Sequence, residues 1–252
     1  MSAIGIGTWN IYNYKNAEEA LINAIEIGVN VLETAAFYAD GLAEELIGRV
    51  VARVGRERLF IVTKLLPYSL ANEDSAIKAV QASLRRLRTN YVDLLLVYGI
   101  HEILPIQHQI RILEMLAEMG YTRYIGVGSY RVKDLKEAIE SVRKYSIVVN
   151  QVVYNVFNKR IERDMLPFSI KNNILVQACR PLDGGSVVRH PLLIKIANNY
   201  KKTPAQIALN FLISRPNVAA IVKSEQKNHV LEIGGAMGWR LNISDIELLE
   251  SL

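Results

Sequence analysis

The chain of 252 residues has little cysteine, few prolines and no long uninterrupted apolar segment. Its single cysteine, Cys179, excludes a disulfide within the chain and suits a reducing compartment, so we expect a cytoplasmic protein. No apolar run reaches the roughly 20 residues that a membrane-spanning helix needs. The opening residues 1–9 form a short segment without basic residues, so we expect no signal peptide.

Charge is spread thinly along the sequence, with 30 basic and 25 acidic residues and a formal net charge of +5. The densest basic cluster, residues 84–88 (LRRLR), contains leucines at helical spacing. We interpret it as a solvated helix face rather than a nucleic-acid-binding patch. The four histidines and the cysteine lack the spacing of metal ligands. We therefore expect no metal site and no nucleic-acid or membrane partner, and no pattern specifies an oligomeric state.

Half of the residues are hydrophobic, and short β-type runs alternate with longer amphipathic stretches. The expected strands are 4–8, 31–34, 59–64, 92–97, 124–128, 148–151, 174–178 and 219–223. The expected helices are 17–27, 42–53, 74–87, 106–119, 133–145, 161–171, 203–214 and 244–252. Strands that alternate with helices in this way predict a parallel sheet.

Eight parallel strands that close on themselves form a (β/α)₈ TIM barrel, and we expect one such α/β domain over residues 1–252. A doubly wound open sheet is the competing topology. It is disfavoured because no strand leads into a complete dinucleotide-binding turn of the form G-x-G-x-x-G. Gly126 and Gly128 follow a strand, but Arg131 occupies the third glycine position.

The expected strands end in polar residues, although the runs that lead to them are apolar. These end residues are Thr8, Glu33, Lys64, Tyr98, Ser129, Gln151, Arg180 and Lys223. In a barrel the carboxyl ends of the strands meet at one face, where barrel enzymes bind their substrates. Polar ends in register therefore predict a ligand site at the mouth of the barrel.

Glu33, Tyr38 and Lys64 place a carboxylate, a phenol and an amine after two neighbouring strands. Charged groups at such ends are costly to bury unless they are paired, so we expect an ion pair between Glu33 and Lys64. A nearby ammonium favours a phenolate, so we also expect Lys64 to lower the pKa of Tyr38. Such a tyrosine is a proton donor for carbonyl chemistry. The alternative is a salt bridge with a purely structural role.

A series of segments along nearly the whole chain resembles the aldo-keto reductase family. The segments are GIGTW, ETAAFY, TK, YVDLLLV, IGVGSY, VNQVVYN, RPL, TPAQIALNFL and IVKS. The resemblance implies a (β/α)₈ barrel that binds an extended nicotinamide cofactor without a Rossmann motif and transfers hydride to or from a carbonyl. It also implies a catalytic tetrad of Asp, Tyr, Lys and His, in which the tyrosine is Tyr38 and the lysine is Lys64.

Two tetrad positions depart from the family pattern. Glu33 replaces the aspartate, and its extra methylene displaces the carboxylate by about 1.5 Å, one single-bond length. Tyr98 replaces the histidine, and it can donate a hydrogen bond to a substrate oxygen but cannot act as an imidazolium. His101, shortly after Tyr98, is a candidate to fill the vacated place, and a surface-loop histidine is the other interpretation.

The resemblance also assigns a set of cofactor-binding residues. They are Thr8, Gly128, Ser129, Gln151, Cys179, Arg180, Pro181, Leu182, Lys223, Ser224 and His229. In the family a Ser-Asn pair and a glutamine hold the nicotinamide carboxamide; here the pair reads Gly128 and Ser129, while Gln151 is retained. Cys179 stands where the family has a tyrosine that stacks on the ring, and Arg180 is a candidate replacement for that stacking.

At the other end of the cofactor, Lys223 and Ser224 match the family's contacts to the 2′-phosphate. His229 stands where the family has an arginine. We therefore expect NADP(H) rather than NAD(H), with a weaker preference than is usual in the family.

Together these features predict an NAD(P)H-dependent reductase of a small aldehyde or ketone. Tyr38 would donate the proton, Lys64 would lower its pKa, and Glu33 would orient Lys64. Tyr98 would polarise the carbonyl, and the two departures predict weak activity. The main alternative is a reductase-like barrel that binds nucleotide or only keeps the fold and acts as a regulatory protein. A Schiff-base lyase that uses Lys64 is a third interpretation, opposed by a neighbouring carboxylate that would keep the amine protonated.

Overall fold

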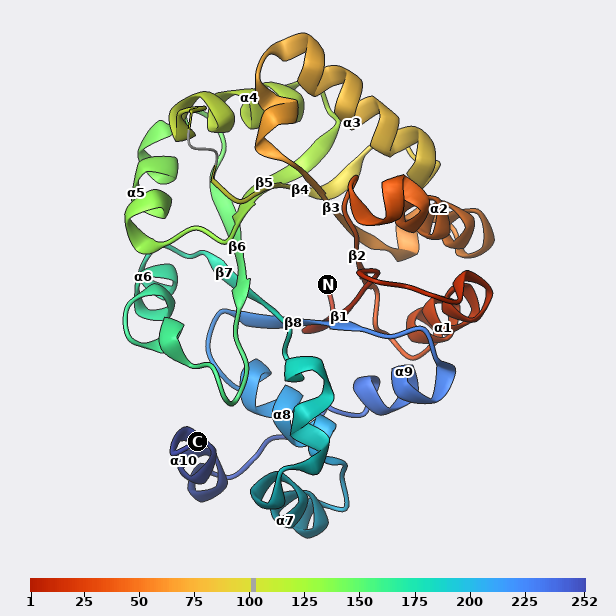
Figure 1. The fold of residues 1–252 in the computed structure, drawn as a ribbon, viewed down its shortest axis with the longest axis vertical. Coiled ribbons are helices and arrows are strands. Elements are labelled where there is room, and N and C mark those ends of the chain that lie inside the picture. The colour runs from red at the N-terminus through yellow and green to blue at the C-terminus, as the bar shows by residue number, and fades with distance from the viewer. Residues whose placement is uncertain (101–102) are drawn as a thin grey trace.

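The computed structural model describes residues 1–100 and 103–252, and its centre is a closed barrel of eight parallel strands (Figure 1). The strands are β1 (Ile4–Gly7), β2 (Val31–Glu33), β3 (Phe60–Leu65), β4 (Val92–Tyr98), β5 (Thr122–Gly128), β6 (Ile147–Val153), β7 (Leu175–Cys179) and β8 (Val218–Lys223). Each strand pairs with its neighbours in sequence, and β8 pairs with β1 to close the barrel. The predicted fold class is confirmed, and every expected strand lies within two residues of an observed one.

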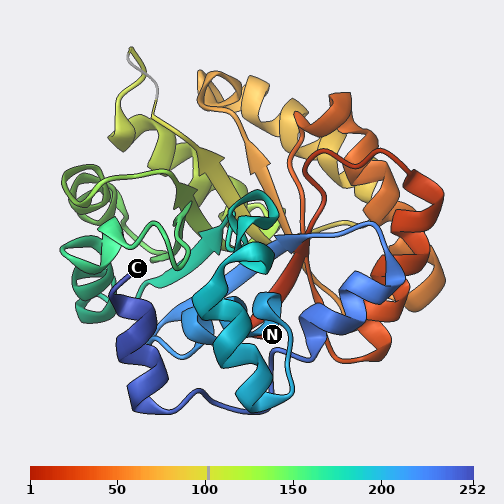
Figure 2. The same cartoon turned by 60° about the horizontal axis from the view of Figure 1, so that its bottom comes forward.

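Helices surround the barrel as an outer layer (Figure 1). They are α1 (Tyr14–Glu26), α2 (Leu42–Val54), α3 (Glu73–Leu87), α4 (Ile106–Glu118), α5 (Val132–Ser141), α6 (Met165–Lys171), α7 (Pro191–Tyr200), α8 (Pro204–Ile213), α9 (Lys227–Gly234) and α10 (Ile243–Glu250). Figure 2 shows the strands inclined inside this layer, with α7, α8 and α10 turned forward. Most of the apolar core lies between the strands and these helices.

Helices α9 and α7 are absent from the helices expected from the sequence, and α7 carries a clear sequence signal. Its first residue is Pro191, whose fixed φ suits the first helical position. Leu193, Ile196 and Ala197 follow at helical spacing and are buried. This proline with the apolar residues after it is the signal that predicts the helix.

The interior of the barrel holds a second, smaller apolar cluster. Its members are Val31, Val62, Leu94, Leu96, Val149 and Ile221. Residues two apart in a strand face the same side of a sheet. Glu33, Lys64 and Gln151 each follow a valine of this cluster by two residues, so their side chains also face the interior, nearer to the carboxyl ends of the strands. The pleat of the strands therefore places three polar residues directly above an apolar layer.

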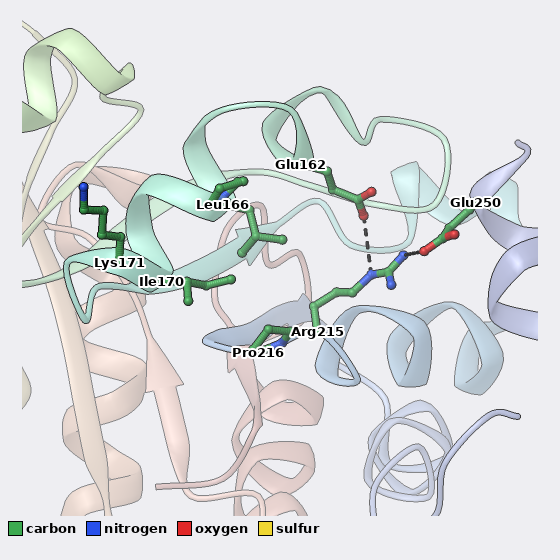
Figure 3. A pocket seen from close by; sticks show the side chains of 8 residues that line it. Glu162, Leu166, Ile170, Lys171, Arg215, Pro216 and Glu250 are labelled. Carbon is green, nitrogen blue, oxygen red and sulfur yellow. Dashed lines mark hydrogen bonds and ion pairs between the residues drawn. The ribbon is translucent and has the colours of Figure 1, made fainter. Parts of the chain in front are cut away.

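The C-terminal helix α10 lies outside the ring of barrel helices and is anchored by charged groups (Figure 1). Arg215 extends between Glu162 and Glu250, at 3.5 and 2.5 Å, in a groove next to α6 (Figure 3). Lys159 donates to the carbonyl oxygens of Leu249 and Glu250, both at 2.8 Å. The contacts of Arg215 and Lys159 therefore hold α10 against the barrel, and we assign this groove a structural role.

Helices α2 and α3 are joined through a buried carboxylate. Glu44 on α2 is fully buried, and it accepts a hydrogen bond from the Thr63 hydroxyl at 2.6 Å. The Arg86 guanidinium on α3 donates from Nε to Glu44 at 2.7 Å. Arg86 belongs to the basic cluster 84–88, in which Leu84 is buried and Arg85 is exposed, as expected for a solvated helix face.

We expect Arg86→Met to lower the free energy of unfolding by about 3 kcal/mol, because it leaves the Glu44 carboxylate buried without a countercharge. Urea denaturation at neutral pH measures the loss. Arg85→Met is the matched control, since it removes an exposed arginine from the preceding position and should change stability by less than about 0.5 kcal/mol. Equal losses in the two variants would contradict the role of the Glu44–Arg86 pair.

Candidate active site

Four polar side chains meet inside the barrel near the carboxyl ends of the strands. Glu33 on β2 accepts a hydrogen bond from the Lys64 ammonium on β3, and its Oε1 also accepts one from Nε2 of Gln151 on β6 at 3.1 Å. Nε2 of Gln151 donates in addition to Oε1 of Gln177 on β7, at 2.8 Å. All four residues are almost fully buried, with at most 3% exposed. A continuous hydrogen-bonded chain therefore crosses the barrel interior.

The predicted ion pair between Glu33 and Lys64 is confirmed. Lys64 also donates to the carbonyl oxygen of Thr34 at 3.0 Å, so its ammonium is held by two acceptors from the same segment. Burial lowers the pKa of Lys64, and the nearby Cys179 acts in the opposite direction. The Glu33 carboxylate in direct contact also favours the charged form of Lys64.

Tyr38 lies in the turn between β2 and α2, and it is 8% exposed. The turn brings its ring beneath the Lys64 ammonium, whose Nζ lies 4.6 Å from the ring centroid. The rings of Trp9 and Phe37 pack edge-on against it, with centroids at 4.9 and 5.0 Å. Tyr38 is therefore held in an aromatic enclosure beside the buried lysine.

The expectation that Lys64 lowers the pKa of Tyr38 is wrong for the structure described here. Burial raises the pKa of Tyr38 above its ordinary value, and the neighbouring Tyr98 and Cys179 raise it further. The ammonium lies over the ring face and donates to Glu33 and Thr34, while the phenolate would be poorly solvated. Tyr38 is therefore a neutral hydroxyl, a form that can donate a proton.

Tyr98 ends β4, with its ring 5.7 Å from that of Phe37 and 6.0 Å from the Lys64 ammonium. It is paired across the sheet with Gly128 on β5. A Cβ at Gly128 would lie 2.9 Å from Cδ2 of Tyr98, closer than such atoms approach. Two departures from the family pattern are thus physically linked, because the tyrosine ring occupies the space that a side chain at residue 128 would need. His101 lies outside the described residues.

The residues assigned to the nicotinamide end surround this site. The Thr8 hydroxyl donates to the Glu33 backbone carbonyl at 3.1 Å. Ser129 and Arg180 adopt positive φ angles of 63° and 53°, which turn the chain at the ends of β5 and β7. Cys179 is close enough to Lys64 to influence its pKa, and burial raises the pKa of the Cys179 thiol itself. Pro181 is buried and Leu182 half-buried at the start of the following loop.

The residues assigned to the 2′-phosphate form a separate group at the end of β8. Lys223 is exposed and lies 3.4 Å from Glu225, and its ammonium is 5.5 Å from the Tyr12 ring centroid. Ser224 is buried, while His229 is exposed on α9. Glu225 also accepts hydrogen bonds from the backbone N–H groups of Tyr12 and Asn13, at 2.8 and 3.1 Å.

Two residues at the site are missing from the sequence-based set. Gln177 is a polar residue in the apolar strand β7, and Glu225 follows directly after the Lys223–Ser224 pair. Gln177 could have been found from the sequence, because a polar residue at an inward position of an apolar barrel strand indicates a functional site. Within the described residues, no group of three His, Cys, Asp or Glu side chains could hold a metal ion. The same part of the chain contains no helix with the length and apolarity needed to cross a membrane.

Comparison with known proteins agrees with the geometry. The family model described as aldo/keto reductase family matches residues 3–252. The chain belongs to this family. The resemblance predicted from its motifs is thereby confirmed, and with it the activity of an enzyme that reduces carbonyl compounds with a nicotinamide cofactor. The alternative of a barrel that only binds nucleotide is not favoured.

Relatives of this aldo-keto reductase match over almost their full length. Methylglyoxal reductase YeaE of Escherichia coli (strain K12) is 31% identical over 259 residues, which cover 99% of this chain and 90% of the relative. Glyoxal reductase of Bacillus subtilis (strain 168) is 28% identical, with 100% and 89% covered. The crystal structure of an aldo/keto reductase from Klebsiella pneumoniae in complex with NADP and acetate has a TM-score of 0.92 and 30% identity, with 100% and 91% covered.

We expect Lys64→Met to cost about 3 to 5 kcal/mol of stability, because it leaves the Glu33 carboxylate buried beside Gln151 without its countercharge. The double change Glu33→Leu with Lys64→Met removes both charges and should be less destabilising than Lys64→Met alone. Guanidinium denaturation of the two single variants and the double variant measures the coupling. Losses that simply add would show that the two side chains do not stabilise each other.

Proposed function

We propose that this aldo-keto reductase reduces a small aldehyde or ketone and that Tyr38 donates the proton to the carbonyl oxygen. The observation that carries the proposal is the position of Tyr38, which is buried beside Lys64 and remains protonated because its pKa is raised. The Lys64 ammonium lies 4.6 Å from the ring centroid of Tyr38 and contacts the ring face, so it positions the phenol in the site. Glu33 holds the lysine in place through their ion pair. Tyr98, at the neighbouring strand end, polarises the carbonyl.

The residues at the barrel mouth fit a nicotinamide cofactor, which supplies the hydride when bound. Gln151 uses both amide hydrogens on Glu33 and Gln177, so its amide oxygen remains as an acceptor for a carboxamide N–H group. Ser129 and Gly128 lie at the adjacent strand end, and Arg180 is exposed beside Cys179. The Gln151 amide oxygen and the exposed Arg180 side chain are therefore the groups proposed to hold the nicotinamide.

NADP(H) is the proposed cofactor, in preference to NAD(H). Lys223 supplies an exposed positive charge for a 2′-phosphate, and Ser224 follows it at the end of β8. The Klebsiella pneumoniae enzymes of the same fold were solved in complex with NADP or NADPH. Glu225, 3.4 Å from Lys223, reduces the net charge at this point and weakens the preference.

Small 2-oxoaldehydes are the proposed substrate class. Two relatives are named methylglyoxal reductase and glyoxal reductase. Trp9, Phe37 and Tyr98 surround Tyr38 with aromatic side chains, and Trp9 is 58% exposed, so a compact carbonyl can approach from the open side of the barrel. We further propose that residues 1–252 work as one domain in the cytoplasm, consistent with a single free cysteine.

We expect Tyr38→Phe to lower kcat for methylglyoxal reduction by roughly 100-fold to 10,000-fold, because it removes the proton donor and keeps the ring packing. NADPH affinity, followed by fluorescence titration, should stay within about twofold of the unchanged protein. Tyr124→Phe is the control, because Tyr124 is an exposed tyrosine near the amino end of β5, at the opposite end of the barrel. Comparable activity in Tyr38→Phe and Tyr124→Phe would rule out Tyr38 as the donor.

Two substitutions at the end of β8 should change cofactor preference in opposite directions. Lys223→Ala should weaken NADPH binding by roughly tenfold to 100-fold and leave NADH binding nearly unchanged, because the phosphate contact is charge-assisted. Glu225→Gln should strengthen NADPH binding, because it removes a negative charge near the phosphate. Calorimetric titration with both cofactors measures the ratio. Lys195→Ala, at an exposed lysine of α7, is the control, and a ratio that responds equally to it would point to a general charge effect.

A further inference from the structure

Gln177 is a buried amide to which the proposed mechanism gives no role. It lies on β7, it is 2% exposed, and its side chain faces the interior of the barrel, where it accepts a hydrogen bond from Gln151. A leucine would fill the same space in an interior that already contains Val149 and Ile221. The presence of an amide there calls for a reason beyond packing.

The hydrogen-bond chemistry of Gln151 supplies that reason. An ionised carboxylate can only accept, so Glu33 must receive an N–H group from Gln151 and cannot face its amide oxygen. The second N–H of the same Nε2 atom points at Oε1 of Gln177, 2.8 Å away. Both hydrogens are therefore used, and the amide plane of Gln151 is fixed at two points.

The same contact fixes Glu33. Its Oε1 accepts from both Lys64 and Gln151, so two donors hold the same carboxylate oxygen. Among the described residues, Nε2 of Gln151 donates to Glu33 and Gln177, so without Gln177 the contact with Glu33 alone sets the rotation of the amide. If the Gln151 amide rotates, its N–H group no longer holds the Glu33 carboxylate against Lys64. The amide oxygen of Gln151 then also loses its fixed direction.

We propose that Gln177 is a positioning residue, which acts through Gln151 to hold the Glu33–Lys64 pair and the Gln151 amide oxygen in one fixed arrangement. The inference rests on the proposed roles of Lys64 and Gln151 in carbonyl reduction. Gln177 links β7 to the chain that runs through β6 and β2 to β3, so it couples the nicotinamide end of the site to the proton-donating end. Displacing a reacting group by about 1 Å can cost roughly 100-fold in rate.

The test compares three variants. Gln177→Leu removes the acceptor and keeps the volume, and Gln177→Glu restores an oxygen acceptor for Gln151. Gln81→Leu is the matched control, because Gln81 is a half-buried glutamine on α3 that donates to the Tyr121 hydroxyl near the amino ends of the strands, away from this chain. We expect Gln177→Leu to lower kcat by roughly 10-fold to 100-fold while the KM for methylglyoxal changes little, and Gln177→Glu to recover most of the loss. The control should keep kcat within about twofold.

A second measurement does not depend on turnover. NMR of the protein labelled with ¹³C-lysine follows the titration of Lys64, which should shift to lower pH in Gln177→Leu, because a loosened Glu33 contact favours the neutral amine. An unchanged Lys64 titration with an unchanged kcat would overturn the positioning role. If Gln177→Leu does not fold, Gln177→Met repeats both measurements. A protein that reduces no carbonyl would refute the proposed function, and the Lys64 titration would still decide whether Gln177 acts on the pair.

Discussion

The buried ion pair between Glu33 and Lys64 is the interaction on which the rest of the site depends. Taking both charges out of water is costly, and the cost is offset only where each group finds further partners. Lys64 donates a hydrogen bond to the Thr34 carbonyl oxygen, and Glu33 accepts one from Gln151. Gln151 donates a second hydrogen bond to Gln177. The need to satisfy two buried charges thus organises side chains from four strands.

The departures from the family pattern make sense as local adjustments to this arrangement. The longer side chain of Glu33 reaches toward the lysine and still meets Gln151 from the opposite wall. Tyr98 fills more space than a histidine would, and its strand partner Gly128 leaves that space free. An aromatic enclosure then surrounds Tyr38, and burial raises its pKa, so the hydroxyl stays protonated.

The layer of helices around the barrel is also stabilised by ion pairs. Glu44 is buried between α2 and α3 and is neutralised by Arg86, while Arg215 bridges Glu162 and Glu250 to hold the C-terminal helix. These contacts lie between neighbouring helices, whereas the site lies at the strand ends. The carboxylates that hold the helices in place are therefore distinct from Glu33, which pairs with Lys64 in the site.

Sequence patterns alone determined the barrel and the positions of its strands, because strand periodicity is a local property. They also predicted the pairing of Glu33 with Lys64, because opposite charges at neighbouring strand ends can offset the cost of each other's burial. The missed helix α7 carried a local signal as well, in Pro191 and the apolar residues after it. Only the tertiary structure decided the pKa of Tyr38, since burial depends on Trp9 and Lys64 arriving from two other segments. It also decided the hydrogen-bond partners of Gln151, because closure of the barrel brings β7 and β2 to this one glutamine, and no spacing along the chain encodes that meeting.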